Sequence, residues 1–251
     1  PILNLGRPPG VTREGDRRVV TAINRLNAER LAKTGDRKIA SRMRAYELAF
    51  RMQAAAPELV DLSGETDRSL ALYGIDRPQT REFGTRCLLA RRMIERGVRF
   101  VELIDTGSSG NWDAHGDMMT HVALSKNVDQ PIAALMKDLK QRGMLEDTLV
   151  VWTTEFGRTP FNNTADAKGR EHHPWAFTSW LAGAGVKSGI TYGETDEHGL
   201  RAEVDKVHVH DFHATILHLL GFDHEKLTYR HAGRDYRLTD VEGSVVKGIL
   251  S

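Results

Sequence analysis

The first part of the chain carries apolar residues at the spacing of an α-helix. Val19, Ile23 and Leu26 follow one another at intervals of four and three residues, and similar spacing runs from residue 39 to residue 54. Such intervals place apolar side chains on one face of a helix and leave the other faces polar. We therefore expect residues 1–97 to form a mainly helical portion of the domain.

Beyond residue 97 the pattern changes to short, continuous apolar runs separated by helical spacing. The runs cover residues 98–104, 148–152 and 177–183, and helical spacing recurs at 132–139 and 212–220. Continuous apolar strands that alternate with helices are typical of a mostly parallel sheet with helices on both faces. The sequence thus predicts an α/β portion over residues 98–251, which also carries the candidate site.

Polar residues suited to chemistry follow two of these runs. Asp113 and His115 lie in the loop after the first run, and Glu155 and Arg158 follow the second. In open α/β sheets, ligands bind beyond the carboxyl ends of the strands. We expect these four side chains to meet at one edge of the sheet.

Two segments have metal-ligand character, and each has a simpler alternative. A small-residue loop that ends in Asp113 and His115 lets both side chains converge on a cation, whereas the alternative is a turn with Asp117 as a helix cap. The adjacent His172 and His173 offer one ligand and one residue that orients it or contacts substrate. The alternative for this pair is two solvated loop histidines.

Together the segments favour a metal site. The predicted ligands are Asp113, His115, Glu155 and His172. Arg158 offers a planar fork for a sulfate or phosphate group, and His173 is a further predicted substrate contact. Oxygen and imidazole ligands suit Zn²⁺, Mn²⁺ or Ca²⁺ better than a soft metal. Hydrolysis at a charged centre is the expected chemistry, because a metal polarises the ester oxygen.

A later segment, residues 207–221, raises a second metal interpretation through its histidines. These are His208, His210, His213 and His218. Asp211 is a natural N-cap for a helix that starts in this segment. We favour a structural role here, with His210 and His213 as neighbours of the site.

The composition narrows the range of partners. The 35 Lys and Arg balance 34 Asp and Glu, so no net charge draws the chain toward nucleic acid or an anionic membrane. We find no apolar run of 18 residues and no signal peptide, and we expect no membrane insertion.

The single cysteine, Cys87, lies on an apolar helical face and is predicted to be a core residue. Because the chain starts at Pro1, we expect a part of a longer, processed or trimmed protein.

Several motifs of the chain are typical of one family. They are TLVVWTTEFGRTP, GREHHP, GVKSGITYGETDEHG, HVHDFHATILHLLGFDH and YRHAGRDYRLTD. Together they resemble a bacterial family of sulfatase-like proteins of unknown function in the alkaline phosphatase superfamily. The resemblance implies an alkaline-phosphatase-like fold and metal-dependent hydrolysis of sulfate or phosphate esters, including carbohydrate-derived ones. It also implies an exported or periplasmic protein.

The resemblance assigns roles to individual residues. The TTEFG turn stands where the superfamily has an Asp-His-Gly turn, with Glu155 in place of the aspartate and Phe156 in place of the histidine. That departure argues against a second metal ion. Asp113 and His115 match an upstream ligand loop, and His172 or His173 matches a later ligand histidine.

Two elements of the superfamily pattern have no counterpart before residue 98. These are the first strand with its metal-binding aspartate and the nucleophile at a helix start. The expectation is a carboxyl-terminal part of such a protein, with a sheet incomplete at its amino-terminal side, and a chain that is inactive by itself. The alternative is a non-catalytic binding or structural protein that keeps the fold.

Overall fold

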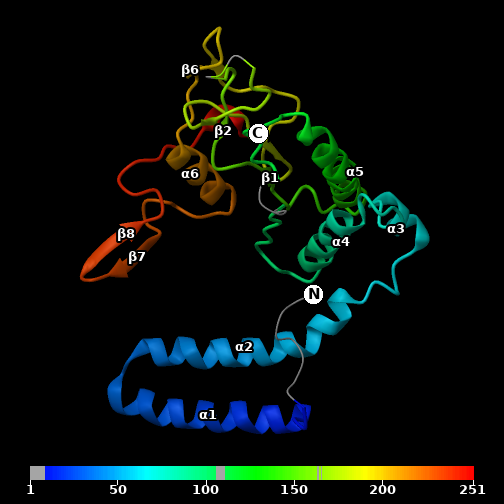
Figure 1. Cartoon of the computed structure of the whole chain (residues 1–251). Helices are drawn as coiled ribbons and strands as arrows, with labels where there is room; N and C mark the ends of the chain where they lie inside the picture. Colours follow the sequence, from blue (N-terminus) through cyan, green and yellow to red (C-terminus); the bar gives the residue numbers. More distant parts are fainter. Residues whose placement is uncertain (1–8, 106–110, 163, 165) are drawn as a thin grey trace. The chain divides into compact units, whose positions relative to one another are not determined.

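The computed structural model describes residues 9–105, 111–162, 164 and 166–251 (Figure 1). Two compact units make up the chain. One comprises Pro1–Leu70 with Arg92–Val101, and the other comprises Ala71–Arg91 with Glu102–Ser251. All the predicted site residues belong to the second unit.

The first unit is built on a pair of antiparallel helices, α1 (Arg13–Thr34) and α2 (Arg37–Val60), which lie side by side in Figure 1. The Thr12 side chain caps α1, and the Asp36 side chain caps α2. Gly35 ends α1 in the left-handed conformation, with φ of 65°, so the chain can reverse within two residues. The helices therefore follow from local capping and spacing.

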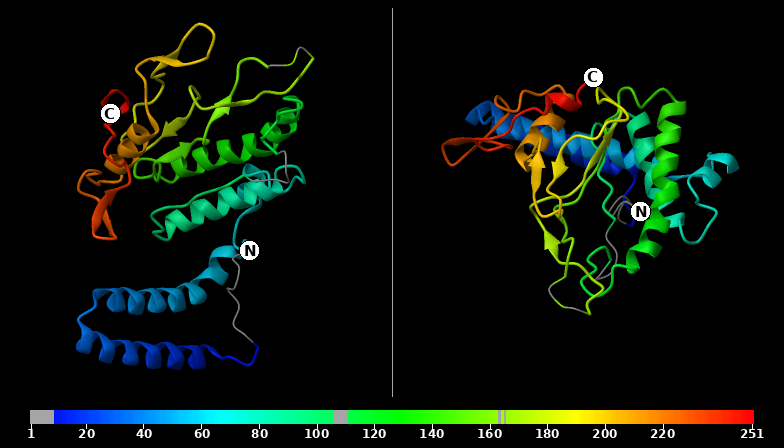
Figure 2. Two further views of the ribbon diagram at one scale, coloured as in Figure 1. Left: turned by 60° about the vertical axis from the view of Figure 1, so that its left-hand side comes forward. Right: turned by 90° about the horizontal axis from the view of Figure 1, so that it is seen from above.

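Three more helices lie between residues 67 and 141. They are α3 (Asp67–Leu72), α4 (Arg81–Glu95) and α5 (Thr120–Gln141), and Figure 2 shows α4 and α5 running side by side. Tyr73, Leu88 and Leu139 are fully buried. Cys87 is also buried, which confirms its prediction as a core residue.

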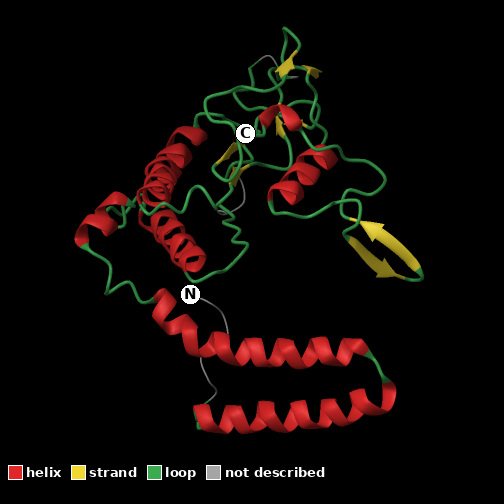
Figure 3. Ribbon diagram, turned by 180° about the vertical axis from the view of Figure 1, so that it is seen from behind, coloured by secondary structure: helices red, strands yellow, loops and turns green. Residues whose placement is uncertain are grey.

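The predicted parallel sheet is wrong. Among the residues that the structure describes, the strands form four two-stranded antiparallel sheets, seen as short yellow arrows in Figure 3. The strands are β1 (Val150–Trp152) with β4 (Trp180–Ala182), β2 (Gly157–Arg158) with β3 (His172–His173), β5 (Glu194–Thr195) with β6 (Ala202–Val204), and β7 (Thr228–His231) with β8 (Arg234–Arg237). The chain therefore does not have an alkaline-phosphatase-like fold, either complete or without its first strand.

The run at residues 98–104 explains the error. It forms no strand, and its side chains Phe100 and Ile104 are 70% and 60% exposed. An apolar run becomes a strand only when a neighbour pairs with its backbone and its faces are covered. Residues 98–104 have the composition of a strand, but no neighbouring strand pairs with them in the structure.

The carboxyl-terminal region adds the helix α6 (Val209–Leu219) and the 3₁₀ helix η1 (Lys247–Ile249). His208 is the N-cap of α6, so the prediction of Asp211 as the cap was wrong. Asp211 instead completes a capping box by accepting a hydrogen bond from the His208 backbone N–H. None of the described helices has both the length and the apolar character that a membrane span needs.

Candidate metal centre

The loop that carries Asp113 and His115 is fixed against the segment before β3. The Met118 N–H donates to Lys168 O at 3.1 Å, and the Arg170 N–H donates to Ala114 O at 3.1 Å. At Gly169 a Cβ would lie 1.7 Å from the carbonyl oxygen of His115, so only glycine allows this approach. Two segments at least 50 residues apart in sequence are thereby held side by side.

The short β2–β3 pair selects which side chains face this loop. Arg158 pairs with His172, and Gly157 pairs with His173. Directly opposed residues of an antiparallel pair share a face, and consecutive residues point to opposite faces. Arg158 and His172 therefore lie on one face, together with the Asp113 side chain that both contact.

Three donor atoms meet at this face. Asp113 Oδ1 lies 3.0 Å from His115 Nε2 and 3.0 Å from His172 Nε2, and the two Nε2 atoms are 3.2 Å apart. Ligands of one ion at about 2.0–2.2 Å stand about 3.0–3.5 Å from one another. The side chains are 53%, 43% and 47% exposed in the same order, so an ion in solution can reach them.

Glu171 determines which ring nitrogen of His115 faces Asp113. Its carboxylate accepts a hydrogen bond from His115 Nδ1 at 3.0 Å, which places the imidazole proton on Nδ1. Nε2, which lies 3.0 Å from Asp113 Oδ1, is then the nitrogen that His115 can offer to a metal ion. A carboxylate behind the far nitrogen is a common support for a metal-binding histidine. Glu171 is not among the residues predicted from the sequence, although its place directly before the histidine pair was a usable signal.

Arg158 pairs with Asp113 at the same oxygen that both histidines approach. Its Nη1 also donates to Arg170 O at 3.2 Å, and its side chain is largely covered. The hydrogen bond from Arg158, followed by that from His172, lowers the pKa of Asp113 to about 2. The carboxylate is consequently ionised throughout the neutral range and available to a cation.

Glu155 and Phe156 flank the centre. In the part of the chain that the structure describes, Glu155 does not belong to the group of donors that lie within 4.8 Å of one another. A hydrogen bond from its own backbone N–H, and then one from the Thr154 hydroxyl, lower the pKa of Glu155. Phe156 contacts the His172 ring at a centroid distance of 4.1 Å and limits how that ring turns. A role for Glu155 as a direct metal ligand stays a prediction.

His173 lies on the other face of β3. It is only 5% exposed, and its Nε2 has no hydrogen-bond partner among the described residues. The structure therefore does not bring His173 to the face that carries Asp113. Its predicted contact with substrate stays untested.

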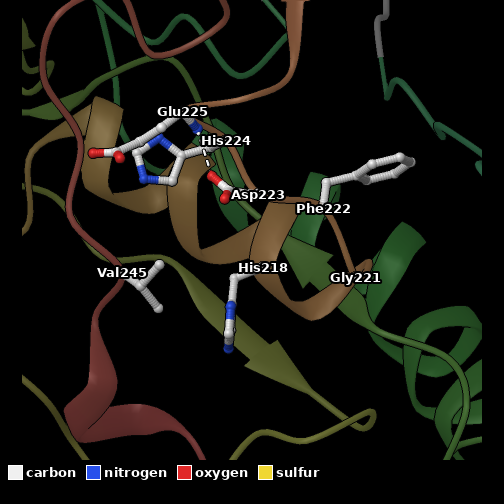
Figure 4. A pocket seen from close by; sticks show the side chains of 7 residues that line it. All are labelled: His218, Gly221, Phe222, Asp223, His224, Glu225 and Val245. Carbon is white, nitrogen blue, oxygen red and sulfur yellow. Dashed lines mark hydrogen bonds between the residues drawn. The ribbon is translucent and has the colours of Figure 1, made fainter.

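The histidines near the carboxyl end of α6 do not belong to the Asp113 group. His218, Phe222, His224 and Val245 help to line an open pocket of about 430 Å³ (Figure 4). His224 is buried and hydrogen-bonds through Nδ1 to Thr239 Oγ1 at 2.9 Å. This contact favours packing over ligand binding for His224.

A family model described as a protein of unknown function, DUF1501, matches residues 1–250. No curated protein and no solved structure matches the chain. The match covers almost every residue, so the expectation that the chain corresponds only to a carboxyl-terminal part is wrong. Nothing in these comparisons supports the resemblance to sulfatases or to the alkaline phosphatase superfamily, and that expectation is withdrawn.

Proposed function

The chain belongs to this family of proteins of unknown function, and we propose a function from the site itself. Asp113, His115 and His172 hold a divalent metal ion that serves the hydrolysis of a sulfate or phosphate ester. The observation that carries the proposal is the approach of the three donors to within 3.0–3.2 Å, with Glu171 behind His115.

The donor set fits a borderline metal. Two imidazoles and one carboxylate match Zn²⁺ or Mn²⁺, whereas Ca²⁺ prefers six to eight oxygen ligands. His115 Nε2 and Asp113 Oδ1 lie 3.0 Å apart. Such a contact is favourable only when a proton or a cation lies between the two atoms, and a divalent ion bound to both would meet that condition.

The surrounding residues suit an anionic substrate. A divalent ion would supply a Lewis acid for the ester oxygen and an activated water. On metal binding, Asp113 would exchange Arg158 for the ion, and Arg158 would remain held near the site through Arg170 O. Its guanidinium would then be free to bind sulfate or phosphate through two parallel hydrogen bonds.

Calorimetric titration with ZnCl₂ and MnCl₂ tests the metal site. We expect saturable binding at this group of residues in the wild-type chain, and about one metal ion fewer per chain in Asp113→Ala and in His172→Ala. His198→Ala is the matched control, because His198 is an exposed histidine outside the cluster. The same number of bound ions per chain in the wild type and in both site variants would refute the metal centre.

A second function, metal-dependent binding of an anion without turnover, also has support. The hydroxyls next to the site are engaged elsewhere: Thr153 with Ser179 at 2.7 Å, and Thr154 with Glu155 at 2.8 Å. An assay with aryl sulfate and aryl phosphate esters in the presence of Zn²⁺ or Mn²⁺ separates the two. Turnover that disappears in His172→Ala selects hydrolysis, and metal and anion binding without turnover selects the binding function.

A further inference from the structure

A second group of donors lies at the amino end of α6. His208, His210 and Glu242 each offer a ligand atom, and these atoms lie within 4.8 Å of one another. We propose that they form a second site for a borderline divalent ion such as Zn²⁺, separate from the Asp113 centre. The ion would join the start of α6 to the segment that carries Glu242.

His210 provides the clearest evidence for a metal ligand in this group. Its Nδ1 is shielded from solvent and has no hydrogen-bond partner among the described residues. Glu242 Oε2 is 3.6 Å from this nitrogen, which is too long for a hydrogen bond. Two ligands bound to one ion at about 2.0–2.2 Å stand at a similar separation, so an ion would satisfy both atoms.

Contacts that do not involve the side chains of the three proposed ligands hold the Glu242 segment in place. Asp211 Oδ1 accepts a hydrogen bond from the Ser244 N–H at 2.7 Å, and Asp211 Oδ2 accepts one from the His208 N–H at 3.0 Å. Gly243 has φ of 96°, and a Cβ there would lie 3.1 Å from the His210 carbonyl oxygen. One carboxylate and one glycine thus bring the Glu242 segment against the helix start.

His208 can change from helix cap to ligand at small cost. In the structure its Nδ1 accepts a long hydrogen bond of 3.3 Å from the His210 N–H, so the imidazole proton is on Nε2. Coordination through Nε2 would move that proton to Nδ1 and end the long hydrogen bond. The bond between Asp211 and the His208 N–H would remain and would keep the helix start closed.

The test is zinc stoichiometry in the full chain, measured by titration with ZnCl₂ and by the metal retained after gel filtration. The background is His172→Ala, which disables the Asp113 centre and leaves the α6 site intact. In this background we expect about one zinc ion per chain. Adding Glu242→Gln should remove that zinc, and this change leaves folding intact because the Glu242 side chain is largely exposed.

Matched controls are Glu225→Gln and His218→Ala, an exposed glutamate nearby and an exposed histidine on the same helix. Both should keep the zinc. A second readout is the visible spectrum of Co²⁺, whose tetrahedral bands should disappear with Glu242→Gln and persist with both controls. Zinc binding that survives Glu242→Gln and His210→Ala would overturn the proposal. Because His172→Ala and Glu242→Gln affect different clusters, failure at one site is distinguishable from failure at the other.

Discussion

Glu171 acts on the candidate metal through His115, because the carboxylate fixes the imidazole proton on Nδ1. In Glu171→Gln the amide no longer enforces that tautomer, and we expect zinc affinity at the Asp113 centre to fall about 10- to 100-fold. Calorimetry on the purified variant measures the change. Glu146→Gln, at an exposed glutamate in a turn, is the control and should bind zinc as the wild type does. Equal affinities in both variants would remove Glu171 from the site.

The pKa of Asp113 offers a direct view of its contact with Arg158. The hydrogen bond from Arg158 is the largest cause of a pKa of about 2, against an ordinary value of 3.8. A lowered carboxyl pKa stabilises the fold above the ordinary value, and this stabilisation is lost as pH falls through about 2. A carboxyl-carbon NMR titration should place the midpoint near 2 in the wild type and closer to 3.8 in Arg158→Ala. Identical midpoints would contradict the ion pair.

The anion-binding role of Arg158 calls for a milder substitution. Arg158→Lys keeps the charge and loses the fork, so we expect weaker binding of sulfate and phosphate to the zinc-loaded chain. The melting temperature should stay close to that of the wild type. Unchanged anion affinity with a lowered melting temperature would instead assign Arg158 to holding Asp113 and the Arg170 carbonyl in place.

At the scale of elements, one buried carboxylate ties α4 to α5. Asp138 accepts a hydrogen bond from the Tyr73 hydroxyl at 2.9 Å and forms ion pairs with Arg91 Nε at 3.0 Å and Arg142 Nε at 2.7 Å. Arg91 is almost fully buried. Removal of the carboxylate would leave that cation in a covered position with its charge less well compensated.

Asp138→Ala should therefore lower the free energy of unfolding by roughly 3–5 kcal/mol, the usual loss when a buried ion pair is broken. Urea unfolding followed by circular dichroism measures the change. Asp129→Ala is the matched control on the exposed side of the same helix and should change stability by less than about 0.5 kcal/mol. A similarly small effect of Asp138→Ala would show that the network does not stabilise the fold.

The elements also differ in how far their own sequence determined them. Helices α1 and α2 form where the spacing predicted helices, because a helix satisfies its backbone within one segment. Only residues 150–152 of the predicted strand at 148–152 pair, and they pair antiparallel with β4. A strand needs a partner from elsewhere in the chain, and the apolar pattern does not specify that partner.

At the scale of the whole molecule, the burial of a thiol and a phenol, which lose their protons only at high pH, makes the folded state less stable as the pH becomes alkaline. Burial raises the pKa of the Cys87 thiol to about 12, and burial with the Asp138 hydrogen bond raises the pKa of Tyr73. A raised pKa gives stability that is fully present below the ordinary value, 9.0 for the thiol, and is lost as pH rises through the folded value. The folded state should weaken steadily above pH 9.

Urea midpoints measured at about pH 8 and about pH 10.5 check this expectation, since the unfolded thiol ionises in that interval. The midpoint should fall in the wild type and fall less in Cys87→Ala. Tyr229→Phe is the control, because Tyr229 is well exposed on β7. A midpoint that does not change with pH would show that the buried thiol and phenol ionise as easily in the folded chain as in the unfolded one.

The sequence by itself determined features that depend on neighbouring residues. These are the amino-terminal helices, the place of Cys87 on a buried face, and the segments that bring Asp113, His115 and His172. Only the tertiary structure decided that the strands pair antiparallel, that Glu171 orients His115, and that Glu242 reaches the start of α6. Periodicity and capping act over a few residues. The contacts of Glu171 with His115 and of Glu242 with His210 join positions more than 30 residues apart, and their geometry depends on how the whole chain folds.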